Sequence, residues 1–215
     1  KGYYKAGKTI DIDITFSEPV SGDVTVTLET GDVDKQCTFT VTQETSGTCN
    51  YTVRAGDTSG DLNVKSVTGT ITDSSGDLVT SILPTSNLKA NKQLIVDTTK
   101  PTAPDTLRIY TSPKKNKRIK TIHPRTFSGV VKAQALKPYF AWEAVPGVKK
   151  FFVKFSNKSI IRNKLLNSDN LRTKRHFRGN IEQADKKYFL YMILQDRAGN
   201  KSSVKTLVEY KIKSE

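Results

Sequence analysis

The sequence predicts an all-β protein of two tandem antiparallel β-sandwich domains, and three observations lead to this prediction. Apolar and polar residues alternate with a period of two, as in Ile10-Asp11-Ile12-Asp13-Ile14, which is typical of half-buried antiparallel strands. Clusters of Gly, Pro, Asp and Ser separate the alternating segments, where turns are expected. The charged residues also divide the 215-residue chain into an acidic and a basic part, each of ordinary domain size.

A proline-containing stretch marks the expected domain boundary. Residues 1–97 contain 8 Lys and Arg and 13 Asp and Glu, which gives a net charge of −5. Residues 98–215 contain 27 Lys and Arg and 8 Asp and Glu, which gives +19, and the two parts sum to the total of +14. Pro101 and Pro104 lie where the charge changes, and proline favours an extended, semi-rigid chain. We therefore expect an acidic domain over residues 1–97, a linker over 98–104 and a basic domain over 105–215.

The first domain is expected to contain about seven short strands and no helix. The clearest alternating segments are residues 10–16, 24–28, 37–41 and 49–53. Between the first two lie Ser17-Glu18-Pro19 and Ser21-Gly22-Asp23, which are expected to separate one strand from the next.

Four motifs of this domain resemble the Ig-like repeats of large bacterial surface proteins and adhesins. They are GYYKAGKTI (2–10), FSEPV (16–20), YTVRAGD (51–57) and IVDTTKPT (95–102). The resemblance covers residues 1–104 and implies an Ig-like sandwich at a cell surface. It also implies the stalk or spacer role that such repeats commonly have.

The two cysteines, Cys37 and Cys49, fall within one predicted hairpin. A cross-strand pair can bring the Cα atoms to the roughly 4.4–6.8 Å that a disulfide needs. The even number, the spacing of 12 residues and an extracellular type of composition favour the bridge. The alternative is a pair of buried free thiols. Metal binding is not expected, because no histidine or further cysteine lies nearby.

The second domain is expected to have strands at both ends and irregular insertions in the middle. Strands are predicted over residues 107–110, 139–145, 151–155, 188–194 and 204–212. The first insertion, 111–136, is expected to hold strands near 118–122 and 130–133. The second, 156–180, is expected to hold one short helix near 160–166.

The motifs of this second domain resemble those of fibronectin type III domains. They are PYFAW (138–142), VPGV (145–148), YFLY (188–191) and DRAGNKS (196–202), with alternation around Phe152-Val153. The resemblance covers the ends of the domain and departs from the family in the two insertions. It implies that Trp142 is a core residue and that Tyr188 forms a tyrosine corner.

Motifs of enzymes and of metal or cofactor sites are not found in the sequence. His123 and His176 have no ligand or triad spacing, and both are expected on surface loops rather than in catalysis. Asp57, Asp61, Asp73, Asp77 and Asp97 could supply calcium ligands, although the same residues favour turns for local hydrogen-bonding reasons. We favour the turns, expect no catalytic residue, no metal and no cofactor, and predict that the protein is not an enzyme.

Two dense basic clusters lie in the two insertions of the second domain. They are KKNKRIK (114–120) and RTKRHFR (172–178), in segments where loops would carry function. The net charge of +19 over residues 98–215 attracts polyanions. The candidate contacts are Lys114, Lys115, Lys117, Arg118, Lys120, Arg172, Lys174, Arg175 and Arg178.

The hypothesis that follows is a non-enzymatic, adhesin-like segment of a bacterial cell-surface or secreted protein, extracellular or periplasmic. Its expected partners are an anionic cell-surface glycan, lipopolysaccharide or an acidic protein, together with neighbouring domains of a longer parent protein. Nucleic acid is not expected, and no apolar run approaches the roughly 20 residues of a membrane span. The alternative is a pair of purely structural spacer domains of a longer surface fibre, whose lysines are solvated and protect strand edges. A third interpretation is that the acidic first domain docks electrostatically on the basic second one.

Overall fold

The computed structural model describes residues 1–79, 82, 84–114 and 117–213, and divides into two units, Lys1–Thr99 and Lys100–Glu215. Each unit is a β-sandwich with its own buried core, and the predicted fold class is confirmed. The division between the units lies within residues 98–104. Thr98 donates a hydrogen bond to the Asp57 carbonyl of the first unit, at 2.9 Å. Ala103 is buried in the core of the second.

The first unit contains two sheets of three strands each. The larger sheet has the order β3-β2-β5, with β2 at Thr9–Leu28, β3 at Lys35–Thr52 and β5 at Val64–Thr72. The smaller sheet has the order β1-β6-β4, with β1 at Gly2–Tyr4, β4 at Thr58–Ser59 and β6 at Leu94–Asp97. The pairing of β1 with β6 is parallel, while the other pairs of this unit are antiparallel.

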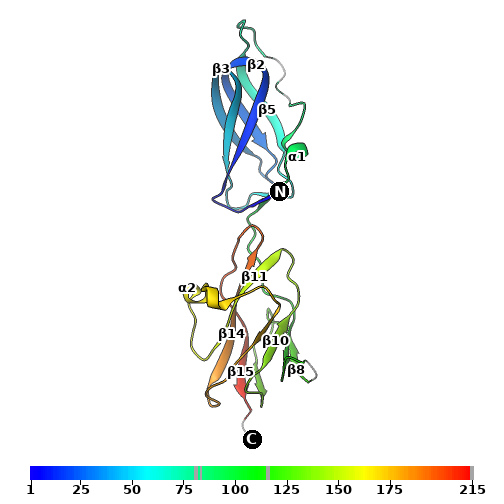
Figure 1. The fold of residues 1–215 in the computed structure, drawn as a ribbon, viewed down its shortest axis with the longest axis vertical. Coiled ribbons are helices and arrows are strands. Elements are labelled where there is room, and N and C mark those ends of the chain that lie inside the picture. The colour runs from blue at the N-terminus through cyan, green and yellow to red at the C-terminus, as the bar shows by residue number, and fades with distance from the viewer. Residues whose placement is uncertain (80–81, 83, 115–116, 214–215) are drawn as a thin grey trace. The chain divides into compact units, whose positions relative to one another are not determined.

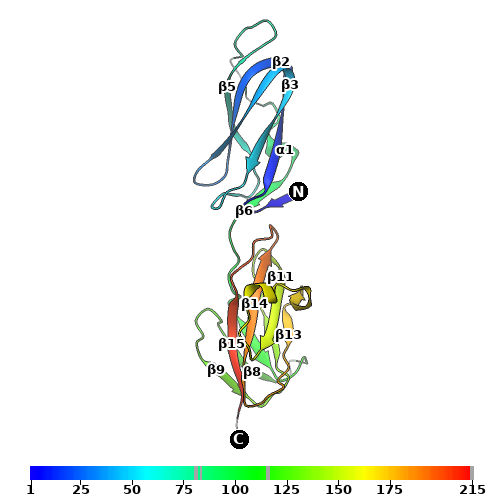
Figure 2. The ribbon, with the colours of Figure 1, turned by 90° about the vertical axis from the view of Figure 1, so that its left-hand side faces the viewer.

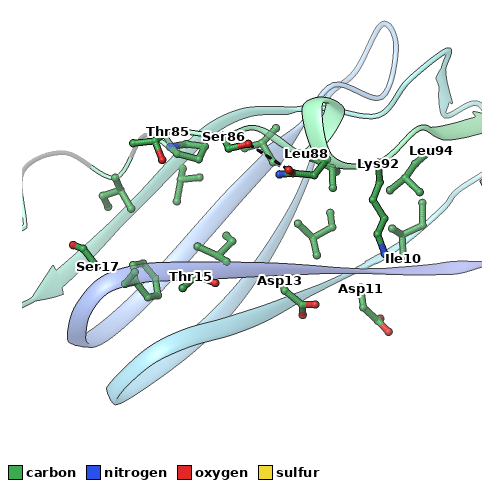
Figure 3. A pocket seen from close by; sticks show the side chains of 18 of the residues that line it. Ile10, Asp11, Asp13, Thr15, Ser17, Thr85, Ser86, Leu88, Lys92 and Leu94 are labelled. Atoms are coloured by element: carbon green, nitrogen blue, oxygen red, sulfur yellow. Dashed lines mark hydrogen bonds between the residues drawn. The ribbon is translucent and has the colours of Figure 1, made fainter. Parts of the chain in front are cut away.

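Strands β2 and β3 are each one long folded strand, where the sequence predicts two separate strands. Their pairing register shifts between Thr15 and Val20 and again before Gly22, so that the expected breakers lie inside β2. Gly22 has a φ of 132°, and a Cβ there would lie 2.2 Å from the Thr70 carbonyl oxygen. Glycine therefore lets β2 bend without ending, and Figure 3 shows β2 turning back beside Ser17.

The disulfide Cys37–Cys49 joins the two halves of folded β3, with the Cα atoms 5.7 Å apart. Cys37 lies opposite Val26 and Cys49 opposite Ile12 in the pairing with β2. Both of these β2 residues are buried in the core. A short helix, α1 (Leu88–Asn91), follows the Asn87 N-cap, whose side chain accepts a hydrogen bond from the Leu88 N–H at 2.7 Å. The expectation of no helix in this domain is therefore wrong.

The second unit contains one sheet of four strands and one of five (Figures 1 and 2). The four-stranded sheet has the order β13-β10-β7-β8, with β7 at Leu107–Tyr110, β8 at Arg118–Ile122, β10 at Tyr139–Trp142 and β13 at His176–Arg178. The five-stranded sheet has the order β12-β11-β14-β15-β9, with β9 at Val130–Ala133, β11 at Val148–Ser156, β12 at Leu171–Arg172, β14 at Lys187–Asp196 and β15 at Lys205–Ile212.

The first insertion adds one strand to each sheet of this unit. Strands β8 and β9 have the predicted residues 118–122 and 130–133, and β9 pairs with β15 in parallel. Without them seven strands remain in two sheets, which is the number of strands in an Ig-type sandwich. The insertion is therefore integrated into the sandwich rather than projecting from it.

The second insertion covers the outer face of the five-stranded sheet. It contains α2 (Arg162–Leu165), within the predicted helical range, and the 3-10 turn Ser168–Asn170. Leu165 is fully buried with Phe152, Tyr191 and Ile193 of the sheet, which forms a second, smaller core. This half of the insertion therefore stabilises the fold, and the chain then passes to β13 on the other sheet.

The core of the second unit agrees with the two expectations from the fibronectin type III resemblance. Trp142 is buried and packs edge-on against Phe151, with 5.3 Å between ring centroids. The hydroxyl of buried Tyr188 accepts hydrogen bonds from the backbone N–H groups of Glu182 and Gln183, each at 3.1 Å. A hydroxyl bound to the backbone a few residues upstream is the geometry of a tyrosine corner.

Candidate polyanion-binding face

The two basic clusters lie at opposite edges of the four-stranded sheet β13-β10-β7-β8. Arg118 is on edge strand β8 and Arg178 on edge strand β13, with β7 and β10 between them. Three strand spacings separate the edges by about 14 Å. The clusters are therefore apart, and they border a single sheet.

Arg118 and Arg178 point to the outer side of this sheet. Residues opposite each other in neighbouring strands share a face. The pairing places Arg178, Tyr139, Tyr110 and Arg118 in one row, in which Tyr110 pairs with Arg118 just after a register shift between Ile109 and Tyr110. The next row along the strands consists of His176, Ala141, Arg108 and Thr121. The alternate residues of β7 and β10, such as Ile109 and Phe140, are fully buried, which places both rows on the outer face.

The aromatic rings of this face are packed against one another. Tyr139 is stacked on His176 with 5.3 Å between centroids and is tilted against Tyr110 at 6.5 Å. Tyr139 is only 7% exposed, and this burial raises the pKa of its phenol. The rings therefore form a packed group on this face, beside the positions from which the arginines project.

The first cluster is divided between this face, a turn and the inner side of β8. Lys114 and Lys117 are exposed in the turn between β7 and β8, and Lys115 lies outside the described residues. Lys120 lies opposite buried Ile109, and its ammonium is 4.9 Å from the ring centroid of Phe127. Arg118 is therefore the member of the cluster whose pairing places it on the outer face.

The second cluster contains one structural arginine and three exposed cations. The Arg172 guanidinium donates to the carbonyls of Asp169 and Leu171, at 2.8 and 2.7 Å, and lies 5.5 Å from the Phe177 ring centroid. Lys174, Arg175 and Arg178 are exposed. An open depression at this edge is lined by Leu171, Arg172, Thr173, Lys174, His176, Phe177 and Arg178.

The charge of this face is uncompensated within its own strands. None of β7, β8, β10 and β13 contains Asp or Glu. Among the ion pairs of the described residues none involves Arg108, Arg118 or Arg178, and the nearest pair in sequence joins Arg125 to Asp105. An arginine without a protein carboxylate retains its planar donors for an external anion.

Sequence reasoning missed four residues of this face, namely Arg108, Tyr110, Tyr139 and His176. The sequence predicts His176 on a surface loop, whereas it is half-buried on β13 and stacked on Tyr139. The alternation in Leu107-Arg108-Ile109-Tyr110 marks Arg108 and Tyr110 as facing away from the core. The sequence does not show the strand order that places Arg108 and Tyr110 between the two clusters, and only the structure reveals it.

Four of the five carboxylates considered as calcium ligands, those of Asp57, Asp61, Asp73 and Asp97, accept hydrogen bonds from backbone N–H groups. Buried Asp57 accepts from the Tyr51 hydroxyl and the Arg54 N–H, both at 2.7 Å, and lies 3.6 Å from the Lys35 ammonium. Asp73 accepts from the N–H groups of Ser75 and Asp77 in a turn. Within the described ranges no group of three or more His, Cys, Asp or Glu side chains is placed to hold a metal ion.

A cavity in the first unit lies between β2 and the segment that carries α1 (Figure 3). Its walls include the apolar side chains of Ile10, Ile12 and Leu88. Asp11 and Asp13 are also among the residues that line it, and Figure 3 shows their side chains on the side of β2 that faces away from α1. The cavity thus has a mixed lining, in which apolar side chains of the sandwich lie beside polar residues such as Thr15, Glu18 and Lys92.

No protein-family model and no curated protein matches the chain. Solved structures do match, and one contains the fibronectin(III)-like modules of Clostridium thermocellum CbhA, with 17% identity, a TM-score of 0.34, and coverage of 99% of this chain and 89% of that one. The FN1–FN3 domains of chicken CNTN1 match with 11% identity, a TM-score of 0.36, and coverage of 98% and 65%. Domains A168–A170 of titin match with 10% identity, a TM-score of 0.37, and coverage of 96% and 61%.

These matches carry no information on the ligand or activity of this chain. Over the part of the chain that the structure describes, no helix is long and apolar enough to cross a membrane.

Proposed function

We propose that the chain is a non-enzymatic, adhesin-like segment of a bacterial cell-surface or secreted protein. In this proposal the second unit contacts an anionic surface ligand, and the first unit is its stalk. The observation that carries the proposal is the outer face of β13-β10-β7-β8, which displays three arginines and no carboxylate from its own strands.

The electrostatics of the second unit support binding of a polyanion. Arginine forms bidentate, charge-assisted hydrogen bonds with carboxylate, sulfate or phosphate groups. The net charge of +19 over residues 98–215 raises the local concentration of anions and their association rate. Because the arginines project from paired strands rather than from long loops, less conformational entropy is lost when they bind.

The absence of an enzymatic role is supported by the surroundings of the titratable groups. His123 Nδ1 lies 3.0 Å from the Asp105 carbonyl oxygen, and His176 is stacked on Tyr139. Asp196 accepts from the N–H groups of Gly199 and Asn200 in a turn. These contacts orient the groups for structure, since none of them joins a base to a nucleophile.

An extracellular location is supported by the disulfide of the first unit. Disulfides persist in oxidising compartments, including the outside of the cell and the bacterial periplasm. The bridge ties the two halves of β3, which suits a stalk that must keep its fold outside the cell. The Ig-like resemblance of residues 1–104 agrees with this location.

The alternative function is that of a purely structural spacer in a longer surface fibre. Two tandem sandwiches favour it, because such modules extend a chain without needing a ligand. In that case the cations serve solubility and discourage edge-to-edge strand pairing.

The experiment that separates the two functions is binding of the whole 215-residue chain to a panel of anionic ligands at several salt concentrations. The panel contains heparin, lipopolysaccharide, teichoic acid, an acidic protein and DNA. A triple variant of the face, R108Q/R118Q/R178Q, is compared with K132Q/K149Q/K154Q, which removes the same charge from exposed positions on the five-stranded sheet. Selective binding near physiological salt that only the face variant loses supports the proposal. Equal losses in both variants support the spacer.

A further inference from the structure

We propose that the outer face of β13-β10-β7-β8 binds one linear anionic polysaccharide that lies across the four strands, from Arg178 to Arg118. This inference rests on the proposed function and names the ligand class of the same site. It adds Arg108 and the Tyr110 hydroxyl, at the centre of the face, to the candidate contacts.

The separation of the two edge arginines favours an extended ligand. Arg118 and Arg178 belong to the same cross-strand row and are separated by about 14 Å, which is three strand spacings. This distance of about 14 Å separates the backbones of the two strands, so one small ion would contact both guanidinium groups only if both long side chains folded inward over the tyrosines of the row. A polymer with a negative charge at regular intervals can contact both arginines in one binding event.

Arg108 lies where a ligand that joins the two edges must pass. It is exposed on β7, in the row next to that of Arg118 and Arg178. The cations therefore form a triangle over β8, β7 and β13, and Tyr110 lies between Arg118 and Tyr139 in the first row. Such spacing fits repeated charges along one polymer better than a compact anion.

The packing of the aromatic rings favours a polysaccharide over single-stranded nucleic acid. Non-specific binding of single strands relies on bases that stack on open aromatic rings. Here Tyr139 is 7% exposed and its ring contacts both His176 and Tyr110. The face thus offers charge and hydroxyl groups to a ligand rather than a stacking platform, and acidic sugars present the complementary carboxylates, sulfates and hydroxyls.

The depression beside β13 provides an anchor at one edge of the face. Its lining includes Lys174, His176 and Arg178, together with the Arg172 guanidinium that backbone carbonyls hold in place. A charged group of the polymer that enters this depression meets several cations at once. The remaining length of the polymer then extends towards Arg108 and Arg118.

The first test compares a heparin octasaccharide with a heparin disaccharide, each titrated into the whole chain by calorimetry near physiological salt. The octasaccharide is expected to bind with one molecule per chain, because a single ligand occupies both edges. The disaccharide is expected to bind at least about tenfold more weakly, because it contacts one edge and loses the linked second contact.

The second test uses single substitutions of exposed residues, R108Q, R118Q and R178Q, with K154Q as the control of equal charge change on the five-stranded sheet. Each face variant is expected to weaken octasaccharide binding by about tenfold through loss of a charge-assisted hydrogen bond. The stoichiometry is expected to remain one, and K154Q is expected to change the affinity by less than about twofold.

The outcomes separate failure of this inference from failure of the proposed function. Two octasaccharides per chain, with one site lost in R118Q and the other in R178Q, would mean two edge sites and overturn the single crossing ligand while leaving a polyanion-binding unit. Equal weakening by K154Q would contradict both. Tighter binding of a single-stranded oligonucleotide of matched charge would overturn the polysaccharide assignment.

Discussion

Removal of the Tyr188 hydroxyl is expected to destabilise the second unit without changing its packing. In Tyr188→Phe the ring can keep its stacking on Phe155, where the centroids are 5.2 Å apart. The backbone N–H groups of Glu182 and Gln183 lose the acceptor that each binds at 3.1 Å. A lost hydrogen bond of this kind costs about 0.5–1.5 kcal/mol, so the two together lower the free energy of unfolding by about 1–3 kcal/mol.

Urea unfolding monitored by tryptophan fluorescence measures this loss. Trp142 is the single tryptophan of the chain and lies in the core of the second unit, so its signal reports that unit. With an m-value of roughly 1.5 kcal/mol/M, a loss of about 2 kcal/mol lowers the midpoint by roughly 1.3 M urea. Tyr51→Phe is the matched control, because it removes a buried hydroxyl from the first unit. A midpoint for Tyr188→Phe within about 0.2 M of the unchanged chain would refute the reasoning.

Three further predictions concern other parts of the two units. Replacing both cysteines by alanine should destabilise the first unit by about 3 kcal/mol, as expected for so short a loop, and thermal unfolding by circular dichroism with and without reductant measures this. Burial raises the pKa of Tyr210 to about 12 from its ordinary 10.0. Between these values the unfolded state has lost the proton that the folded state keeps, so the stability of the second unit should fall above about pH 10, and less steeply in Tyr210→Phe. Arg172→Ala should lower the urea midpoint of the Trp142 transition by removing two backbone contacts, at a cost of about 1–2 kcal/mol.

Alternation of apolar and polar residues was enough to predict both sandwiches, because burial of one sheet face imposes a period of two on the sequence. The same logic located β8 and β9 within an insertion. It failed where the chain bends without ending, as in β2, because Gly22 and the register shifts let the ladder continue past Pro19. A local sequence signal for a break does not distinguish a bend from the end of a strand.

The candidate site was only partly predictable, because charge density in the sequence does not contain the strand order. Charge density predicts Arg118 and Arg178 as members of dense clusters, and it also predicts Arg172, whose guanidinium instead donates to backbone carbonyls. Arg108 is isolated in the sequence and joins the site only through the pairing of β7 between β8 and β10. The alternation of residues within one strand shows which face each residue is on, but it does not show which distant strand lies beside it.

The most direct test of the account is NMR mapping of a heparin octasaccharide on the whole, isotope-labelled chain. We expect the amide shifts to change on β7, β8, β10 and β13, with the largest changes around Arg108, Tyr110 and Arg118 and in the segment 174–178. We expect the five-stranded sheet and the first unit to change little. Changes centred on β11, β14 and β15, or spread evenly over the lysines of the second unit, would contradict the account.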